Sequence, residues 1–271
     1  MSGSLDVRGL TAGYRRRRIL DRLDLPTFRN GDLVAVVGAN AAGKSTFMRA
    51  VSGLLPMQGE VRLDGEDLGS LPPAERLRRV GYLPQTLPQA SSLVAYESLM
   101  AALRTADPSM PRDRIEHRVE RVFDDLGLRA LAFRPLGELS GGQRQMLGLA
   151  QVLARQPRLL LLDEPTSALD LRWQIQVLER VRHTTDAGGI ALVAIHDLNL
   201  ALRFCDRLVV LKDGALLAAG DPLEVLDAEL LARAYGIEGR VERCSHGYPI
   251  VQADRIARPS ETLSTHEANT R

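Results

Sequence analysis

The N-terminal part of the chain carries short apolar segments that predict β-strands. Three segments are of this kind: Leu5 to Leu10, Ile19 to Leu25 and Glu60 to Leu63. Between the second and the third, the apolar run Leu33 to Val37 leads into a glycine-bounded loop and then into a stretch with helical spacing of apolar residues. The pattern predicts an antiparallel β layer with one unit of strand, loop and helix set into it.

The middle of the chain, from Pro88 to about Arg155, has helical periodicity. Its apolar residues recur every three or four positions, which places them on one face of each helix. This spacing predicts a mainly helical sub-domain inserted into the β framework. The apolar faces consist of Ile115, Val119, Val122, Phe123 and Leu126 in one stretch and of Met146, Leu149, Ala150 and Leu153 in the other.

Continuous apolar runs return after the helical stretch, at Leu159 to Leu162, Ile190 to Ile195 and Leu208 to Leu211. A helical segment, Trp173 to Arg182, separates the first two runs. Short apolar strands that alternate with helices are typical of a parallel sheet covered on both faces. The fold class predicted is therefore α/β with a mainly parallel sheet.

The end of the chain has a lower density of apolar residues. We expect the main domain to span residues 4–240, with the helical sub-domain at about 88–155, and residues 241–271 to form a C-terminal extension. From about Asp254 the residues are polar and lack a period, which predicts a disordered tail.

Composition and charge narrow the range of functions. The 35 basic and 34 acidic residues leave a net charge of +1, so no global field attracts the chain to nucleic acid or to anionic lipid. The longest aliphatic run, Leu159 to Leu162, is far shorter than the roughly 20 residues that cross a bilayer, which favours a cytoplasmic location. Cys205 and Cys244 have no metal or redox spacing, so we expect two isolated reduced thiols.

The glycine-bounded loop has the residue pattern that binds nucleotide phosphate. Its two glycines let successive backbone N–H groups converge on an anion, and the helix that follows adds its positive N-terminal end. Lys44 supplies a charge for the β- and γ-phosphates, and the Ser45 hydroxyl is placed to ligate Mg²⁺. The loop predicts ATP binding by Gly38, Ala39, Asn40, Ala41, Ala42, Gly43, Lys44, Ser45 and Thr46.

Two acids follow the apolar run Leu159 to Leu162, at the edge where open α/β sheets bind their ligands. Strand alternation directs the carboxylates of Asp163 and Glu164 to different sides. Asp163 is suited to hold Mg²⁺ through water, and Glu164 to polarise the attacking water as general base. An isolated acid pair would be a solvated strand end, but the phosphate loop upstream favours hydrolysis.

The sequence Leu139-Ser140-Gly141-Gly142-Gln143 resembles the signature of the ATP-binding cassette (ABC) ATPases, and further motifs appear in that family's order from about residue 5 to residue 215. The resemblance implies a RecA-like P-loop NTPase core with an N-terminal antiparallel β sub-domain and an inserted α-helical sub-domain. It implies that Tyr14 stacks on adenine, that Gln85 is the Q-loop glutamine and that His196 is the switch histidine.

The resemblance further implies that Glu164, His196 and Gln85 are the catalytic residues. It implies that Ser45, Gln85 and Asp163 are the metal ligands. A D-loop is implied at Ser167, Ala168, Leu169 and Asp170.

The Ser-Gly-Gly segment predicts a second anion site. Ser140, Gly141 and Gly142 lie where a helix begins, at about Gln143, and their N–H groups have no phosphate of their own to bind. The resemblance implies that this segment closes over the γ-phosphate held by another copy. We therefore expect two copies to bind and hydrolyse ATP as a head-to-tail dimer.

The phosphate loop departs from the family pattern in two places. Ala39 and Ala41 stand where the family commonly has Pro and Gly. We expect nucleotide binding to persist if Ala41 keeps the backbone angles of the loop without a positive φ, because Gly43, Lys44 and Ser45 are retained.

The region after His196 resembles the ATPases that drive import of iron-siderophores, haem and cobalamin. The resemblance implies permease subunits in the membrane, a periplasmic or extracellular substrate-binding protein as an indirect partner, and a place at the cytoplasmic face of the inner membrane. Ser92 to Glu97 lies where that group couples to its permease. The residues that carry the resemblance are Asp213-Gly214, Gly220 to Leu226, Tyr235-Gly236 and Gly247 to Pro249.

Two other classes remain as alternatives. One is a soluble ABC ATPase that acts on DNA, on ribosomes or as an iron–sulfur scaffold; such proteins often carry a coiled-coil insertion or a second cassette, and the sequence has neither. The other is a P-loop kinase or GTPase, against which Ser140 to Gln143 argues, as does the lack of a recognisable nucleoside-acceptor lid. We expect no nucleic-acid partner.

Overall fold

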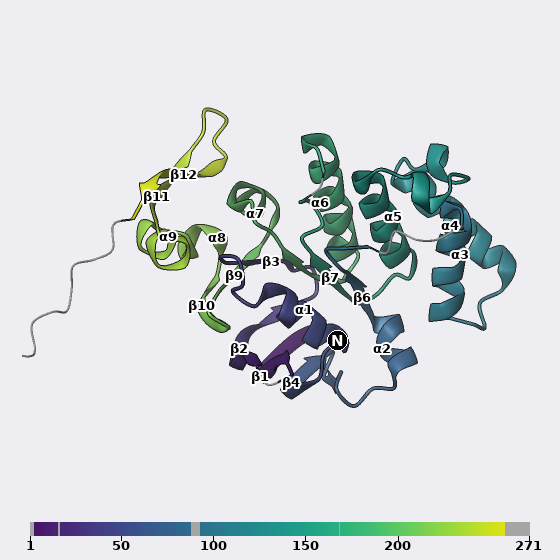
Figure 1. Cartoon of the computed structure of the whole chain (residues 1–271), viewed down its shortest axis with the longest axis horizontal. Coiled ribbons are helices and arrows are strands. Elements are labelled where there is room, and N and C mark those ends of the chain that lie inside the picture. Colours follow the sequence, from purple (N-terminus) through teal and green to yellow (C-terminus); the bar gives the residue numbers. More distant parts are fainter. Residues whose placement is uncertain (1–2, 16, 88–92, 168, 258–271) are drawn as a thin grey trace, which may run out of the picture.

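The computed structural model describes residues 3–15, 17–87, 93–167 and 169–257 (Figure 1). A four-stranded antiparallel sheet and a six-stranded, mainly parallel sheet form the framework. The antiparallel sheet has the order β2-β1-β4-β5, with β1 at Ser4–Tyr14, β2 at Arg17–Arg29, β4 at Met57–Leu63 and β5 at Glu66–Asp67. The second sheet has the order β10-β9-β3-β8-β7-β6, with β3 at Leu33–Val37, β6 at Val80–Leu83, β7 at Leu159–Asp163, β8 at Ile190–Ala194, β9 at Arg207–Lys212 and β10 at Ala215–Gly220.

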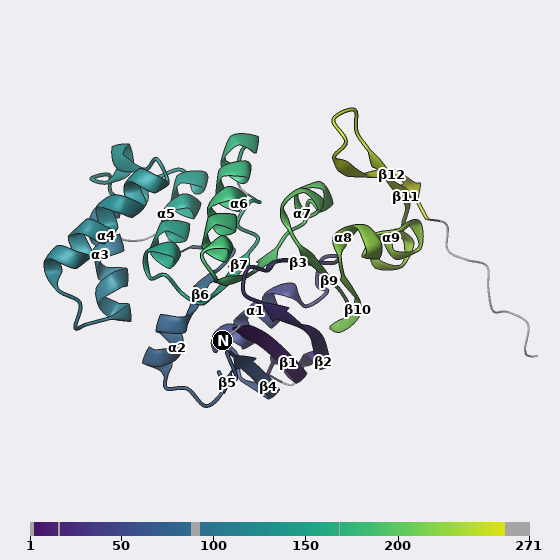
Figure 2. The same cartoon turned by 180° about the vertical axis from the view of Figure 1, so that it is seen from behind.

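The helices cover the two faces of the six-stranded sheet and extend beyond it. Figure 1 shows the helices of the inserted sub-domain and the C-terminal elements at opposite ends of this sheet, an arrangement that the view from behind repeats (Figure 2). The helices are α1 at Lys44–Ser52, α2 at Pro73–Arg79, α3 at Ala95–Ala106, α4 at Arg112–Asp125, α5 at Gly141–Ala154, α6 at Leu171–Asp186, α7 at Leu198–Phe204, α8 at Pro222–Val225 and α9 at Ala228–Tyr235. Short 3₁₀ turns lie at Arg129–Leu131 and Leu136–Glu138, and a final hairpin joins β11 at Ile237–Arg243 to β12 at Pro249–Ile256.

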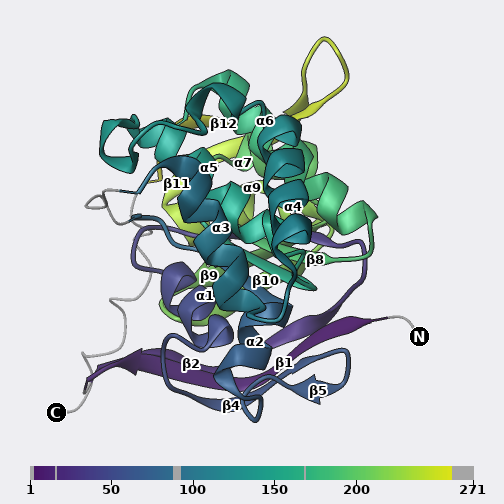
Figure 3. The same cartoon turned by 90° about the vertical axis from the view of Figure 1, so that its right-hand side faces the viewer.

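Strand β3 shows why the apolar runs of the sequence have no polar alternation. Its residues Leu33, Ala35 and Val37 pack into the core shared with α5, α6 and α7, whereas Val34 and Val36 pack into the core shared with α1 and the antiparallel sheet. Both faces of the six-stranded sheet are therefore buried, as the continuous runs predicted. Figure 3 shows the antiparallel sheet below this layer and the helices of the other face above it.

The mainly parallel sheet, the antiparallel strands and the helical insertion agree with the predicted fold class. On the inserted helices, the predicted apolar faces are buried at Ile115, Val119 and Phe123 in α4 and at Met146 and Leu149 in α5. Among the described residues, none of the helices combines the length and the apolar composition that a membrane span requires.

Two strands of the structure run across the boundaries predicted near the C-terminus. The boundary between residues 240 and 241 falls inside β11, and the tail predicted from Asp254 begins inside β12. Polar residues form strands here because they pair across the hairpin: Arg240 Nη1 donates to Asp254 Oδ2 at 2.6 Å, and Arg255 Nε donates to Glu238 Oε2 at 2.7 Å. The rest of the predicted tail, residues 258–271, lies outside the described residues.

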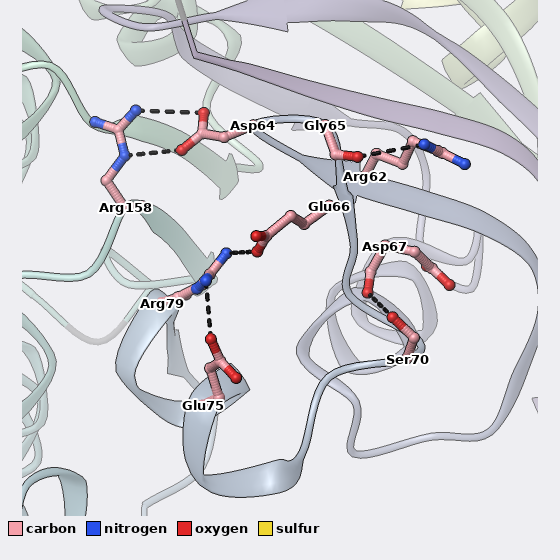
Figure 4. Close-up of polar contacts among 9 residues, drawn as sticks. All are labelled: Arg62, Asp64, Gly65, Glu66, Asp67, Ser70, Glu75, Arg79 and Arg158. Carbon is pink, nitrogen blue, oxygen red and sulfur yellow. Dashed lines mark hydrogen bonds and ion pairs between the residues drawn. The ribbon is translucent and has the colours of Figure 1, made fainter.

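The layers are fastened at the edge where β7 and β8 begin. Arg158 lies just before β7, and its guanidinium contacts the turn between β4 and β5 through Asp64, with Nε to Oδ2 at 3.1 Å (Figure 4). The same side chain donates to Asn30 Oδ1 at 3.0 Å and to the Gly188 carbonyl at 2.6 Å. Nearby, Arg79 of α2 pairs with Glu66 and Glu75 (Figure 4). These contacts lie at the amino ends of β7 and β8. The carboxyl ends of the parallel strands, where α/β sheets bind ligands, lie at the opposite edge.

Candidate active site

The carboxyl ends of three parallel strands bring the predicted site residues together. Strand β8 pairs in parallel with β3 on one side and with β7 on the other, so the loops that follow these strands meet at one edge. A cavity of about 600 Å³ opens there. Its lining includes the predicted residues Asn40 to Thr46, Tyr14, Gln85, Glu164 and His196, and two residues that were not predicted, Arg17 and Ile19.

The phosphate loop is shaped by residues in left-handed conformations. Gly38 has φ 143°, and a Cβ there would lie 2.2 Å from the Leu211 carbonyl oxygen, so glycine is required. Gly43, with φ 106°, caps α1. The condition set for Ala41, loop angles without a positive φ, is not met, because its φ is 64°. The methyl group of Ala41 makes this left-handed conformation cost about 1–2 kcal/mol.

Lys44 is held inside the loop by the backbone. Its Nζ donates to the Gly38 carbonyl at 2.8 Å and to the Ala39 carbonyl at 3.1 Å, and only 5% of the residue is exposed. Burial lowers the pKa of Lys44, and the carboxylates of Glu164 and Asp163 oppose that shift. The ammonium group lies at the floor of the cavity. A phosphate bound there would replace its hydrogen bonds to neutral carbonyls with stronger, charge-assisted ones.

Ser45 and Asp163 form a pair of hard oxygen donors. The Ser45 hydroxyl donates to Asp163 Oδ1 at 2.9 Å, and Tyr82 donates its hydroxyl to Asp163 Oδ2 at 3.4 Å. Burial raises the pKa of Asp163, and the Ser45 hydrogen bond opposes the rise. The described residues include no cluster of three or more His, Cys, Asp or Glu side chains that could hold a metal. Ser45 and Asp163 offer one hydroxyl and one carboxylate, with room beside them for phosphate oxygens and water. This set fits Mg²⁺, which keeps several oxygen ligands from water and phosphate.

Glu164 is clamped between two polar side chains. Its Oε1 lies 2.5 Å from His196 Nε2, and its Oε2 accepts a hydrogen bond from Gln85 Nε2 at 2.7 Å. Glu164 follows β7 with φ 53°, so this turn, and not strand alternation, sets the direction of its carboxylate. The structure thus brings Gln85 to Glu164, and not to the Ser45 and Asp163 pair where it was expected as a metal ligand.

Tyr14 stands at the rim of the cavity with 40% of its surface exposed. Arg49 of α1 donates to its hydroxyl at 3.4 Å, and Arg17 is its partner across the hairpin. An exposed ring beside the phosphate loop suits stacking on a base. Arg49 and Tyr82 were missed as neighbours of the site, because only the packing of α1 against β6 brings them there.

The Ser-Gly-Gly segment lies outside this cavity, at the start of α5. The Ser140 hydroxyl accepts from the Gln143 N–H at 3.2 Å, and Gln143 Oε1 accepts from the Ser140 N–H at 2.9 Å. This capping box places the helix start two residues before the predicted one. Among the described residues, the backbone N–H groups of Gly141 and Gly142 have no hydrogen-bond partner. They remain available to a phosphate from outside the chain.

The predicted D-loop connects the acid pair to α6. The Ser167 hydroxyl donates to the Glu164 carbonyl at 3.1 Å, and Asp170 caps α6 by accepting from the Trp173 N–H at 3.0 Å. Leu169 is buried. Ala168 lies outside the described residues, as does Ser92 of the predicted coupling segment.

Comparisons with known proteins agree with this geometry. A family model described as ABC transporter matches residues 20–167. The hemin import ATP-binding protein HmuV of Myxococcus xanthus is 41% identical over 88% of this chain and 92% of its own length. The cobalamin import ATP-binding protein BtuD of Halobacterium salinarum is 39% identical over 86% of this chain and 58% of its own length.

Among solved structures, a dimeric post-hydrolysis state of the ATP-binding cassette MJ0796, bound to ADP and phosphate, is 25% identical. The match has a TM-score of 0.72 and covers 80% of this chain and 98% of that one.

Proposed function

Because this chain belongs to the ABC transporter family and is an ATPase, we propose that it powers the import of an iron chelate, haem or cobalamin across the cytoplasmic membrane. The observation that carries the proposal is the cavity that the phosphate loop, Glu164 and His196 line together. The names of its relatives, one a hemin and one a cobalamin import protein, favour this cargo class over a soluble scaffold role.

We propose that ATP binds with its base on Tyr14 and its phosphates in the loop from Gly38 to Thr46. Lys44 then exchanges its backbone carbonyl partners for β- and γ-phosphate oxygens. Ser45 and Asp163 would hold Mg²⁺, which neutralises phosphate charge when it is bound. Gln85 would have to leave Glu164 before it could join them.

Glu164 is the proposed general base. Its carboxylate must be free to accept a proton from the attacking water, so its contacts with His196 and Gln85 have to loosen when the phosphates arrive. His196 can then turn its ring toward the γ-phosphate, where a hydrogen bond would stabilise the charge that develops. The clamp seen here would therefore keep the base occupied until nucleotide is in place.

A second copy of the chain is the partner that completes the site. The unpartnered N–H groups of Gly141 and Gly142 would close over the γ-phosphate of the other copy, so that ATP joins two subunits head to tail. The membrane permease is the other partner. We propose that it docks beside Leu93 to Glu97, and that the substrate-binding protein acts through the permease alone from the far side of the membrane.

Replacing Glu164 with Gln tests the ATPase mechanism. The amide cannot accept the proton, so turnover should fall by a factor of about 10²–10⁴ while nucleotide still binds. Size-exclusion chromatography with MgATP should show a trapped dimer. Glu179→Gln, an exposed acid on α6, is the matched control and should behave as the wild type. A fully active Glu164→Gln variant would remove Glu164 as the base.

Replacing Lys44 with Ala separates binding from chemistry. Loss of the ammonium group should weaken MgATP binding itself, which titration calorimetry measures. An unchanged affinity would contradict the role of the loop.

The cargo class is tested by purifying the chain with its permease from membranes and reconstituting the complex in vesicles. ATP-dependent uptake of haem, cobalamin or a ferric siderophore is the expected result. Association with ribosomes or DNA, and none with a membrane protein, would favour the scaffold alternative.

A further inference from the structure

The last four elements form a C-terminal unit, defined as residues 222–256, which comprises α8, α9, β11 and β12. It lies at the β9 and β10 end of the six-stranded sheet, next to α7 (Figure 1). Its apolar side chains, among them Leu231, Val241 and Val251, join the core on the α7 face of that sheet. None of these elements supplies a residue to the nucleotide cavity, yet two of them contact the segments that do.

The first contact is with α7, the helix that follows His196. Asn199 Oδ1 accepts a hydrogen bond from the Val251 N–H of β12 at 2.7 Å. The N–H of Asn199 is itself capped by Asp197 Oδ1 at 2.8 Å, and Asp197 directly follows His196. The hairpin therefore holds the first turn of α7, three residues from the histidine.

A second contact joins the hairpin to α7. The guanidinium of Arg203 lies 5.3 Å from the ring centre of Tyr248, which stands at the start of β12. Helix α7 has only seven residues, a length that is not stable without tertiary support. The hairpin supplies that support through these two contacts.

The other end of the unit reaches the phosphate loop. Lys212 Nζ, at the end of β9, donates to the Arg233 carbonyl at 2.7 Å and so fixes the last turn of α9 at the ligand edge of the sheet. Strand β9 pairs with β3 as far as Val37, the residue before Gly38, and Tyr235 in the last turn of α9 has its hydroxyl near the Gly38 backbone. Burial raises the pKa of Tyr235 to about 12, so the hydroxyl stays neutral in this contact. Gly38 in turn accepts from Lys44 through its carbonyl.

We propose that the C-terminal unit is a bracket that fixes the switch histidine relative to the phosphate loop, with Asn199 and Tyr235 as positioning residues for ATP hydrolysis. The inference rests on the proposed roles of His196 and Lys44. A reacting group that is displaced by an ångström loses much of its effect, so a fixed spacing between these two residues sustains the rate. Through Asn199 the bracket fixes the position of His196, and through Tyr235 it fixes the position of the phosphate loop.

Asn199 is tested by a pair of variants in the complete transporter complex. Asn199→Ala removes the acceptor, and we expect kcat to fall about threefold to tenfold while KM for ATP stays within about twofold. Asn199→Asp keeps an acceptor oxygen at the same place and should restore kcat. A wild-type kcat for Asn199→Ala overturns the proposal, and so does a loss that Asn199→Asp fails to rescue.

Tyr235 is tested by removing one oxygen atom. Tyr235→Phe should raise KM for ATP about threefold and leave the melting temperature nearly unchanged, because the ring still fills its place. Tyr248→Phe is the matched control, since its ring keeps the contact with Arg203, and it should behave as the wild type. An unchanged KM for Tyr235→Phe contradicts the link to the loop.

The two proposals fail in different ways. If Glu164→Gln retains full turnover, the proposed catalytic roles are wrong whatever the bracket does. If Glu164→Gln is inactive and Asn199→Ala hydrolyses ATP at the wild-type rate, the site stands and only the bracket is wrong.

Discussion

Ala41 and Glu164 are non-glycine residues of the site with backbone angles that L-residues rarely adopt, φ 64° and φ 53°. Each such angle costs on the order of 1–3 kcal/mol, which the surrounding structure has to offset. Ala41 lies in the loop that lines the cavity, and Glu164 has its carboxylate in contact with Gln85 and His196. Local strain therefore coincides with the positions that face the phosphates.

Ala41→Gly should relieve part of that strain. Glycine adopts the left-handed angle without the methyl clash but loses more entropy on folding, so we expect a net stabilisation of about 0.5–1 kcal/mol in chemical denaturation. Ala42→Gly is the neighbouring control: Ala42 has no positive φ and is 4% exposed, so the same change should destabilise. Equal effects at the two positions would contradict the strain at Ala41.

The two thiols should differ in reactivity. Burial raises the pKa of Cys205 to about 12, whereas Cys244 is only partly buried. At pH 8 a thiol reagent should therefore label one cysteine, Cys244, and reach Cys205 only after denaturation. Because the folded pKa of Cys205 lies above the unfolded value, its contribution to stability is complete below about pH 9 and is lost as the pH rises toward 12. Rapid labelling of both thiols in the folded protein would contradict this.

Local spacing indicated the loop residues Asn40 to Thr46 that line the cavity, whereas Tyr14, Gln85 and His196 were named from the family resemblance. Lys44 and Ser45 are neighbours of Gly43 in sequence and in the cavity alike, so the sequence pattern carries their geometry. Tyr82 could not be predicted, because its contact with Asp163 depends on the pairing of β6 with β7, which are far apart in the chain. Tyr235 is farther still from Gly38, and nothing in its surrounding sequence indicates that neighbour.

Among the elements, α5 shows how one helix start serves two purposes. Its N-cap Ser140 satisfies the Gln143 N–H, while the first two N–H groups stay open. The side chain thus stabilises the helix without filling the anion site. A mutation there can affect stability, partner binding or both.

Two Ser140 variants separate these effects. Ser140→Ala loses the cap and should destabilise the chain by about 1 kcal/mol in thermal or chemical denaturation. Ser140→Asp keeps a capping acceptor but adds a negative charge, so the monomer should stay stable while MgATP no longer drives dimerisation. The dimer is measured by light scattering in the Glu164→Gln background. A Ser140→Asp chain that still dimerises would contradict the closure of this segment over phosphate.

Elements with strong apolar periodicity were predicted well, and polar ones were missed. Strands β3, β7 and β8 are buried on both faces and appear in the sequence as continuous apolar runs. The tail was predicted to begin at about Asp254, yet β12 runs to Ile256, because its residues pair across the hairpin through ion pairs such as Arg240 with Asp254. Helix α2 was also missed, since none of its residues is buried and no apolar face marks it.

At the scale of the whole molecule, the two edges of the six-stranded sheet have separate tasks. One edge carries the nucleotide cavity, and the other carries the Arg158 contacts that join the antiparallel sheet to β7 and β8 (Figure 4). The proposed chemistry and the fastening of the layers are therefore expected to respond to different mutations.

Arg158→Ala should weaken the fold and spare the site. The guanidinium is 40% exposed and its partner Asp64 34%, so we expect a loss of about 1–3 kcal/mol in the free energy of unfolding, with unchanged ATP affinity. Arg62→Ala is the control, because Arg62 pairs with Glu60 of its own strand on the surface, and it should cost clearly less than Arg158→Ala. Equal losses for the two variants would show that Arg158 does not fasten the layers.

The place of Cys244 in the hairpin has a practical consequence. It stands at the turn of the β11–β12 hairpin, where its N–H donates to the Tyr248 carbonyl at 2.9 Å, on the element that holds the helix after His196. A fluorescent dye attached there would report changes around α7 during each catalytic cycle, without any engineered attachment point.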